Sequence, residues 1–137
     1  MKGLGLRTII YLVPDLTIGK RWYHEAFGIA PYFDESFYVG FNIGGYELGL
    51  LPDTPSETKS DNVLSYWGVE NIQAAYDELL SKGATSHQAP TSVGGELMVA
   101  TVKDPWDNVI GIIYNPHFNS NDVLDFPEEI LKDQYSK

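Results

Sequence analysis

The sequence contains no cysteine. That absence excludes disulfide bonds, thiolate metal sites and a cysteine nucleophile, and it favours a cytoplasmic protein. The sequence also lacks any apolar run near the roughly 20 residues that a membrane-spanning helix needs. Residues 1–7 lack the apolar block and small-residue cleavage site of a signal peptide.

Basic residues are also few, with 9 Lys and Arg against 19 Asp and Glu, a formal net charge of −10. Such a surface repels phosphate backbones and anionic lipids, so we expect no nucleic-acid partner and no membrane partner. The full sequence of 137 residues is 43% hydrophobic and 13% aromatic, which is enough for one domain with a core. Part of the acid excess lies in residues 119–137, which we interpret as a solvated acidic C-terminal tail on a single domain of residues 1–118.

The chain contains the same arrangement twice. "GLRTIIYLVPDL" (residues 5–16) and "NVLSYWGVENI" (residues 62–72) are β-rich runs, and each changes to helical periodicity. We expect Asp15 and Asn71 to cap the two helices, whose starts lie about 55 residues apart, and Gly28 and Gly83 to end them. A repeat of that size indicates two modules, at about residues 4–52 and 62–116.

Strand patterns follow each helix. Residues 36–45 and 46–52 predict a hairpin with Gly44 and Gly45 as its turn, and residues 95–105 and 108–116 predict a second hairpin. Shorter strands are expected near residues 31–33 and 86–90, and the polar stretch 53–62 is predicted to be a linker. The predicted fold class is therefore α+β, with two βαβββ modules.

This order of motifs resembles the vicinal oxygen chelate superfamily of glyoxalases, bleomycin resistance proteins and dioxygenases. The resemblance is carried by "VPDL", "WYHEAFG" (residues 22–28), "GVENIQAAYDELLSKGA" (residues 68–84) and "DPWDNVIGI" (residues 104–112). It implies that the modules form an open, curved, mixed β-barrel around a cavity, with helices outside, and that the protein is a homodimer.

One motif departs from the family pattern. The family usually has Asp-Gly where this chain has Trp106-Asp107. We expect Pro105 to lie in a tight turn whose backbone donates hydrogen bonds to Asp104. Trp106 has two interpretations: a lid or buried aromatic side chain, or a ring that stacks on a ligand.

Metal-dependent members of the superfamily place ligands at four inward-facing strand positions. The resemblance maps these positions to Thr8, Glu47, Leu64 and Gly111. Leucine and glycine offer no ligand atom in their side chains, and one carboxylate would hold a divalent ion weakly. We therefore expect no metal cofactor, although a divalent metal stays an alternative.

The three histidines do not replace the missing ligands. His24 is predicted on the exposed side of the first helix, His87 in a loop and His117 after the last strand, without metal-binding spacing. We interpret them as surface or capping residues. The sequence also has no GxSxG motif, P-loop or dinucleotide-binding glycine motif.

Strand alternation predicts which side chains line the cavity. With Thr8, Glu47, Leu64 and Gly111 inward, the wall is mostly apolar, and the glycines either leave room for a ligand or mark strand curvature. Phe41 and Trp67 are among the residues expected at the rim or interface. The predicted ligand-binding residues are Thr8, Tyr38, Glu47, Tyr66, Met98, Trp106 and Gly111.

Glu47 is the only candidate catalytic acid or base. It could also bind a cationic ligand, pair with Arg7 or Arg21, or be solvated. The favoured hypothesis is a metal-free, bleomycin-resistance-like protein that binds a small, partly aromatic or cationic molecule. The alternatives are a metal-dependent lyase or isomerase of glyoxalase type, or a dioxygenase, with a diverged metal site, and a module that only self-assembles. Whether the protein is an enzyme stays open.

Overall fold

A computed structural model describes residues 1–2, 4–54, 58–60 and 62–118. The first module contains β1 (Thr8–Val13), α1 (Leu16–Phe27), β2 (Phe33–Glu35), β3 (Tyr38–Ile43) and β4 (Tyr46–Pro52). The second contains β5 (Tyr66–Gly68), α2 (Ile72–Ser81), β6 (Thr85–Gly94), β7 (Leu97–Lys103) and β8 (Val109–Tyr114). The predicted α+β fold with two βαβββ modules is confirmed. The predicted acidic tail lies outside the described residues.

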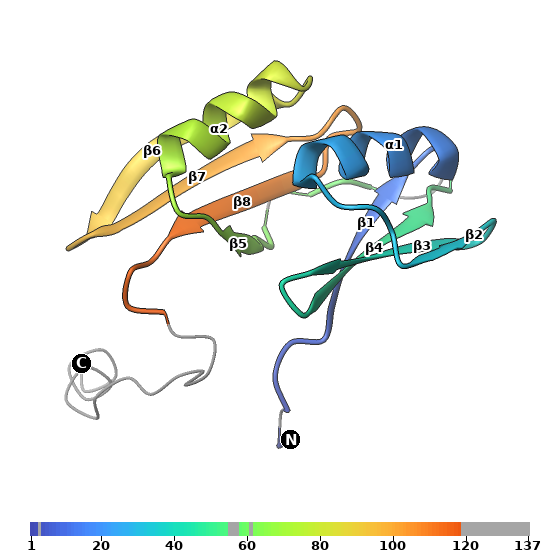
Figure 1. Cartoon of the computed structure of the whole chain (residues 1–137), viewed down its shortest axis with the longest axis horizontal. Coiled ribbons are helices and arrows are strands. Elements are labelled where there is room, and N and C mark those ends of the chain that lie inside the picture. The colour runs from blue at the N-terminus through green and yellow to red at the C-terminus, as the bar shows by residue number, and fades with distance from the viewer. Residues whose placement is uncertain (3, 55–57, 61, 119–137) are drawn as a thin grey trace.

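Each module forms its own mixed four-stranded sheet. The strand order is β1-β4-β3-β2 in the first sheet and β5-β8-β7-β6 in the second. In both, the first and last strands of the module pair in parallel, and the remaining pairs are antiparallel. Both helices lie on the same side of the two sheets, which leaves the opposite side without a helix (Figure 1).

The predicted helix caps and the predicted glycine turn are present in the structure. The Asp15 carboxylate accepts hydrogen bonds from the backbone amides of Thr17 and Ile18, and the Asn71 side chain accepts one from Ala74. Gly28 ends α1 in a left-handed conformation. The β3–β4 turn has positive φ at both Gly44 and Gly45, as its tight geometry requires.

Two strands differ from the prediction. β5 is only three residues long, although the β-rich run around it is longer. β6 has ten residues where a short strand was expected, and register shifts interrupt its pairing with β7. Those bulges break the regular alternation on which strand prediction depends.

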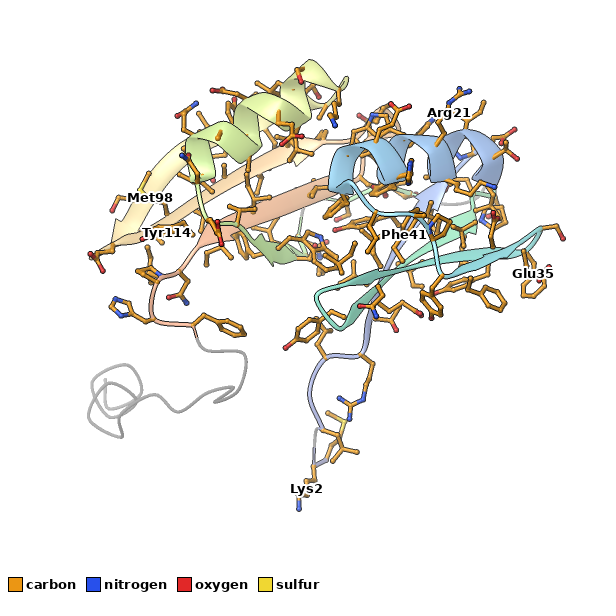
Figure 2. All side chains as sticks on the ribbon, viewed as in Figure 1. Lys2, Arg21, Glu35, Phe41, Met98 and Tyr114 are labelled. Atoms are coloured by element: carbon orange, nitrogen blue, oxygen red, sulfur yellow. The ribbon has the colours of Figure 1, made fainter. Side chains whose placement is uncertain are left out.

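The core lies between the sheets and the helices. Val13, Phe41, Leu48 and Ile110 are fully buried, and Tyr23 of α1 packs among the buried residues. Figure 2 shows Phe41 between its sheet and α1, so the expectation that Phe41 lies at a cavity rim is wrong. Among the described residues, no helix is long and apolar enough to cross a membrane.

Side chains hold the two modules together across the core. Tyr23 of α1 donates a 2.7 Å hydrogen bond to Asp104 in the β7–β8 turn, and the Asn108 side chain donates to the Leu12 carbonyl oxygen of β1. Trp22 donates to the Lys82 carbonyl oxygen at the end of α2. These bonds fix one module against the other without continuous strand pairing.

Candidate ligand-binding face

We call the side of the two sheets away from the helices the open face. Strand register decides which side chains belong to it, because directly paired residues point to the same side. Thr8 pairs with Glu47 and Ile10 with Gly49 in the first sheet, and Tyr66 pairs with Gly111 in the second. The alternate residues, such as Tyr11, Leu48 and Ile112, are buried under the helices.

Glu47 lies at the centre of a cluster on the first sheet. Tyr38 of β3 donates a 2.6 Å hydrogen bond to Glu47 Oε2, and Tyr32, which precedes β2, donates a short one to Oε1. Both phenols therefore direct their protons at one carboxylate. Burial raises the pKa of Tyr38, and a tyrosine phenol is already protonated, and so able to donate, at neutral pH.

The tyrosine rings lie on glycine backbone. A Cβ atom at Gly40 would come within 3.2 Å of ring carbons of both Tyr32 and Tyr38. A Cβ atom at Gly49 would overlap the Tyr38 hydroxyl and lie 2.7 Å from Ile10 Cδ1. The missing side chains at these two positions allow the phenols to reach Glu47.

Neither arginine considered as a partner contacts Glu47. The hydrogen bond of Arg7 is to the Leu4 carbonyl oxygen. Arg21 lies on the outer side of α1, away from the sheets (Figure 2). Within the described part of the chain, no Lys, Arg or His forms an ion pair with Glu47.

Among the described residues, no carboxylate takes the place of Glu47 on the second sheet. The Gly111 amide donates a 2.9 Å hydrogen bond to the Ser65 carbonyl oxygen. A Cβ atom at Gly111 would overlap that oxygen and lie 2.7 Å from Tyr66 Cδ1. Tyr66 therefore covers the place where a residue-111 side chain would project. Leu64 precedes β5 and takes no part in its pairing.

His87, which lies beside Thr101 on the second sheet, is not where the sequence predicts it. His87 lies in β6 and not in a loop, and its Nδ1 atom is 2.8 Å from Thr101 Oγ1. Thr101 is buried and pairs with Gly111. The register shift between Ser86 and Gln88 hid this position, because it interrupts the strand pattern. His24 and His117 are exposed, as predicted.

The predicted site residues fall into two groups. Thr8, Tyr38, Glu47, Tyr66 and Gly111 belong to the open face. Met98 pairs with Tyr114 and packs against the core from the helix side. Trp106 also packs there, with its ring edge-on to Trp22 at a centroid distance of 6.1 Å.

Trp67, expected at the rim or interface, also belongs to the helix side. It pairs with Ile112, and its indole nitrogen donates a 3.2 Å hydrogen bond to the Tyr11 hydroxyl. Its ring packs edge-on against Phe27. Like Met98 and Trp106, it is therefore not brought together with Glu47.

The turn that carries Trp106 is built around Asp104. Its Oδ1 atom accepts hydrogen bonds from the backbone amides of Trp106 and Asn108. Its Oδ2 atom accepts from the Asn108 side chain and from Tyr23. The expected role of Asp104 as an acceptor for the turn is therefore confirmed, and the same carboxylate also links the turn to α1.

A pocket of about 430 Å³ lies elsewhere, on the helix side of the first module. It is formed by the start of α1, the β2–β3 turn and the end of β4, with Asp15, Lys20, Asp34 and Glu35 among its lining residues. Lys20 and Asp34 form a 2.8 Å ion pair. None of the predicted ligand-binding residues lines this pocket.

Comparison with known proteins agrees with this architecture. The model of the Glyoxalase/Bleomycin resistance protein/Dioxygenase superfamily matches residues 5–112. The chain belongs to this superfamily. No curated protein matches the sequence.

Solved structures show the same fold at low sequence identity. A glyoxalase-related enzyme from Fulvimarina pelagi superimposes with a TM-score of 0.69 at 18% identity, over 82% of this chain and 89% of that chain. A glyoxalase/bleomycin resistance protein/dioxygenase family enzyme from Burkholderia phytofirmans PsJN gives 0.68 at 19% identity, over 78% and 95%. The fosfomycin resistance protein FosX from Listeria monocytogenes gives 0.67 at 15% identity, over 85% and 96%.

The residues at the superfamily's metal-ligand positions do not suit a divalent ion. Glu47 is the one carboxylate among them, and two phenols donate hydrogen bonds to it. Position 111 has no room for a side chain. Across the described ranges, no group of three His, Asp or Glu residues is arranged to hold a metal ion. We therefore derive no chemistry through a metal.

Proposed function

We propose that this superfamily member binds a small organic molecule on the open face and does so without a divalent metal. The observation that carries the proposal is the pair of phenol groups on Glu47. A carboxylate with both oxygens hydrogen-bonded to phenols is positioned for recognition by its remaining lone pairs. Apolar groups of the same face supply contact area, since Ile10 is 40% exposed and Tyr66 41% exposed.

We further propose that a second copy of the chain closes this face into a cavity. Small-molecule sites are usually concave and bury most of the ligand, whereas the open face of a single chain is exposed at Ile10 and Tyr66. A homodimer is therefore the assembly to test, and light scattering coupled to size-exclusion chromatography measures it.

A ligand screen by thermal shift in buffer with chelator tests the binding proposal. A compound at about 100 times its Kd should add roughly 2.7 kcal/mol to the free energy of unfolding. We expect at least one class of small molecule to raise the melting temperature with the chelator present, and Tyr66→Ala to reduce that increase. A protein that dimerises but responds to no compound would instead be a self-assembling module. A cytoplasmic location, which the cysteine-free composition favours, stays a prediction.

A further inference from the structure

We infer that the ligand of the open face is an organic cation, such as an ammonium group, held by Glu47, Tyr32 and Tyr38. This inference rests on the proposed function and assigns the chemical class of its ligand. It follows from hydrogen-bond directions, the aromatic surroundings and the charge of the cluster.

The hydrogen-bond directions leave the cluster with acceptors only. An ionised carboxylate accepts and cannot donate, and a phenol has one proton to donate. Tyr32 and Tyr38 both use that proton on Glu47. What remains for a ligand is the free lone pairs of the carboxylate and of two phenol oxygens, so the complementary ligand group carries positive charge, on N–H groups or on the polarised C–H groups next to a quaternary nitrogen.

The surroundings favour a group that is positively charged and partly apolar. The Phe33 ring lies 6.0 Å from the Tyr38 ring and 6.2 Å from the Phe37 ring, measured between centroids. Tyr32 and Phe37 are each more than 60% exposed. Aromatic faces attract ammonium groups through the ring quadrupole, and the attraction is strongest for cations that are weakly hydrated.

Among the residues that the structure describes, no Lys, Arg or His forms an ion pair with Glu47. Lys20 forms its ion pair with Asp34, and Lys59 forms one with Asp53. Within the described part of the chain, Glu47 has no such partner. The formal net charge of −10 adds a long-range attraction for cations.

Choline and its uncharged carbon isostere 3,3-dimethylbutan-1-ol separate charge from shape. We expect NMR titration to give choline an affinity about tenfold higher than that of the isostere, since that difference corresponds to roughly 1.4 kcal/mol of charge-dependent attraction. Equal affinities for the two compounds at the open face would overturn the assignment to a cation.

Single substitutions test whether Glu47 and Tyr32 are the residues that attract choline. Glu47→Gln should lower choline affinity about tenfold while leaving the isostere's affinity unchanged. Glu25→Gln removes the same charge from the exposed side of α1 and should have no effect, which makes it the matched control. Tyr32→Phe keeps the ring and should retain most of the affinity, whereas Tyr32→Ala should lose it. Tyr32 is 64% exposed, so neither change removes core packing.

The outcomes separate this inference from the proposed function. If neutral or anionic compounds bind the open face and choline does not, the cation assignment is wrong and the binding function stands. If no compound of any charge binds there, both are wrong. If Glu47→Gln changes the oligomeric state but not choline affinity, the cluster serves self-association, and the inference is again overturned.

Discussion

The backbone amide of Gly111 donates a hydrogen bond to the carbonyl oxygen of Ser65 at 2.9 Å. This contact joins the last strand of the second module to the residue before β5. It also brings the Ser65 carbonyl and the Tyr66 ring over the α-carbon of Gly111. Steric closure therefore favours glycine at position 111, to which the resemblance maps a metal ligand.

Gly111→Ala should destabilise the fold. The added Cβ atom would overlap the Ser65 carbonyl oxygen, which is backbone and cannot rotate away. Overpacking of this kind costs about 1–3 kcal/mol, measurable by urea denaturation. Gly68→Ala is the control, because a Cβ atom there meets nothing within 4 Å. Equal stability of the two variants would show that position 111 is not sterically closed.

Asp104→Ala should be among the most damaging substitutions. Asp104 is a buried residue with 3% of its surface exposed, and its side chain accepts four hydrogen bonds. Its removal leaves buried donors without partners, which we expect to cost about 3 kcal/mol or more. Tyr23→Phe removes one of the four donors and should cost roughly 1–2 kcal/mol. An Asp104→Ala variant as stable as Glu70→Gln, an exposed acid control, would contradict this account.

Stability should fall as pH rises above about 10, the ordinary pKa of tyrosine. Burial raises the pKa of Tyr23, and the neighbouring Asp104 carboxylate raises it further. Burial also raises the pKa of Tyr11, against the opposing effect of its hydrogen bonds with Ser65 and Trp67. The folded state therefore keeps protons that the unfolded state releases above pH 10.

The sign follows from proton linkage. The stabilisation is complete below pH 10 and declines above it, by at most about 1.4 kcal/mol per pH unit for each tyrosine. Urea denaturation between pH 8 and pH 11 measures the slope. Tyr23→Phe should flatten the slope, although it lowers stability at neutral pH. An unchanged slope would mean that Tyr23 does not contribute.

Asp107 occupies a backbone conformation that glycine adopts more easily. Its φ is 68°, and it is the one non-glycine residue of the described chain with a positive φ. Asp107→Gly should be neutral or stabilising by up to about 1 kcal/mol, whereas Asp107→Val should cost roughly 1–2 kcal/mol. Thermal denaturation compares the two variants. A Val variant as stable as the Gly variant would show that the turn relaxes to another conformation.

Much of the fold could be predicted because its signals are local. A helix cap such as Asp15 acts on amides two and three residues away, and the Gly44-Gly45 turn sets its own register. β6 was underestimated because its register shifts leave no regular alternation, and His87 was therefore placed in a loop. These errors arise where strand geometry is irregular and not where propensity is weak.

The candidate site was only partly predictable. Glu47 and Tyr38 were identified, but the role of Tyr32 depends on a ring crossing the bare backbone of Gly40. Trp106 is partly buried, and its packing against Trp22 joins segments that lie far apart in the sequence. Contacts of that kind depend on how the two modules pack against each other, and local sequence patterns do not predict that packing.

Metal content tests the central claim most directly. Inductively coupled plasma mass spectrometry should be applied to two samples. One is protein purified without chelator, and the other is protein incubated with Zn²⁺, Ni²⁺, Mn²⁺ or Fe²⁺ and then desalted. We expect far less than one ion per chain in both samples, with ligand binding unchanged. One tightly held transition ion per chain, lost in Glu47→Gln, would contradict that claim.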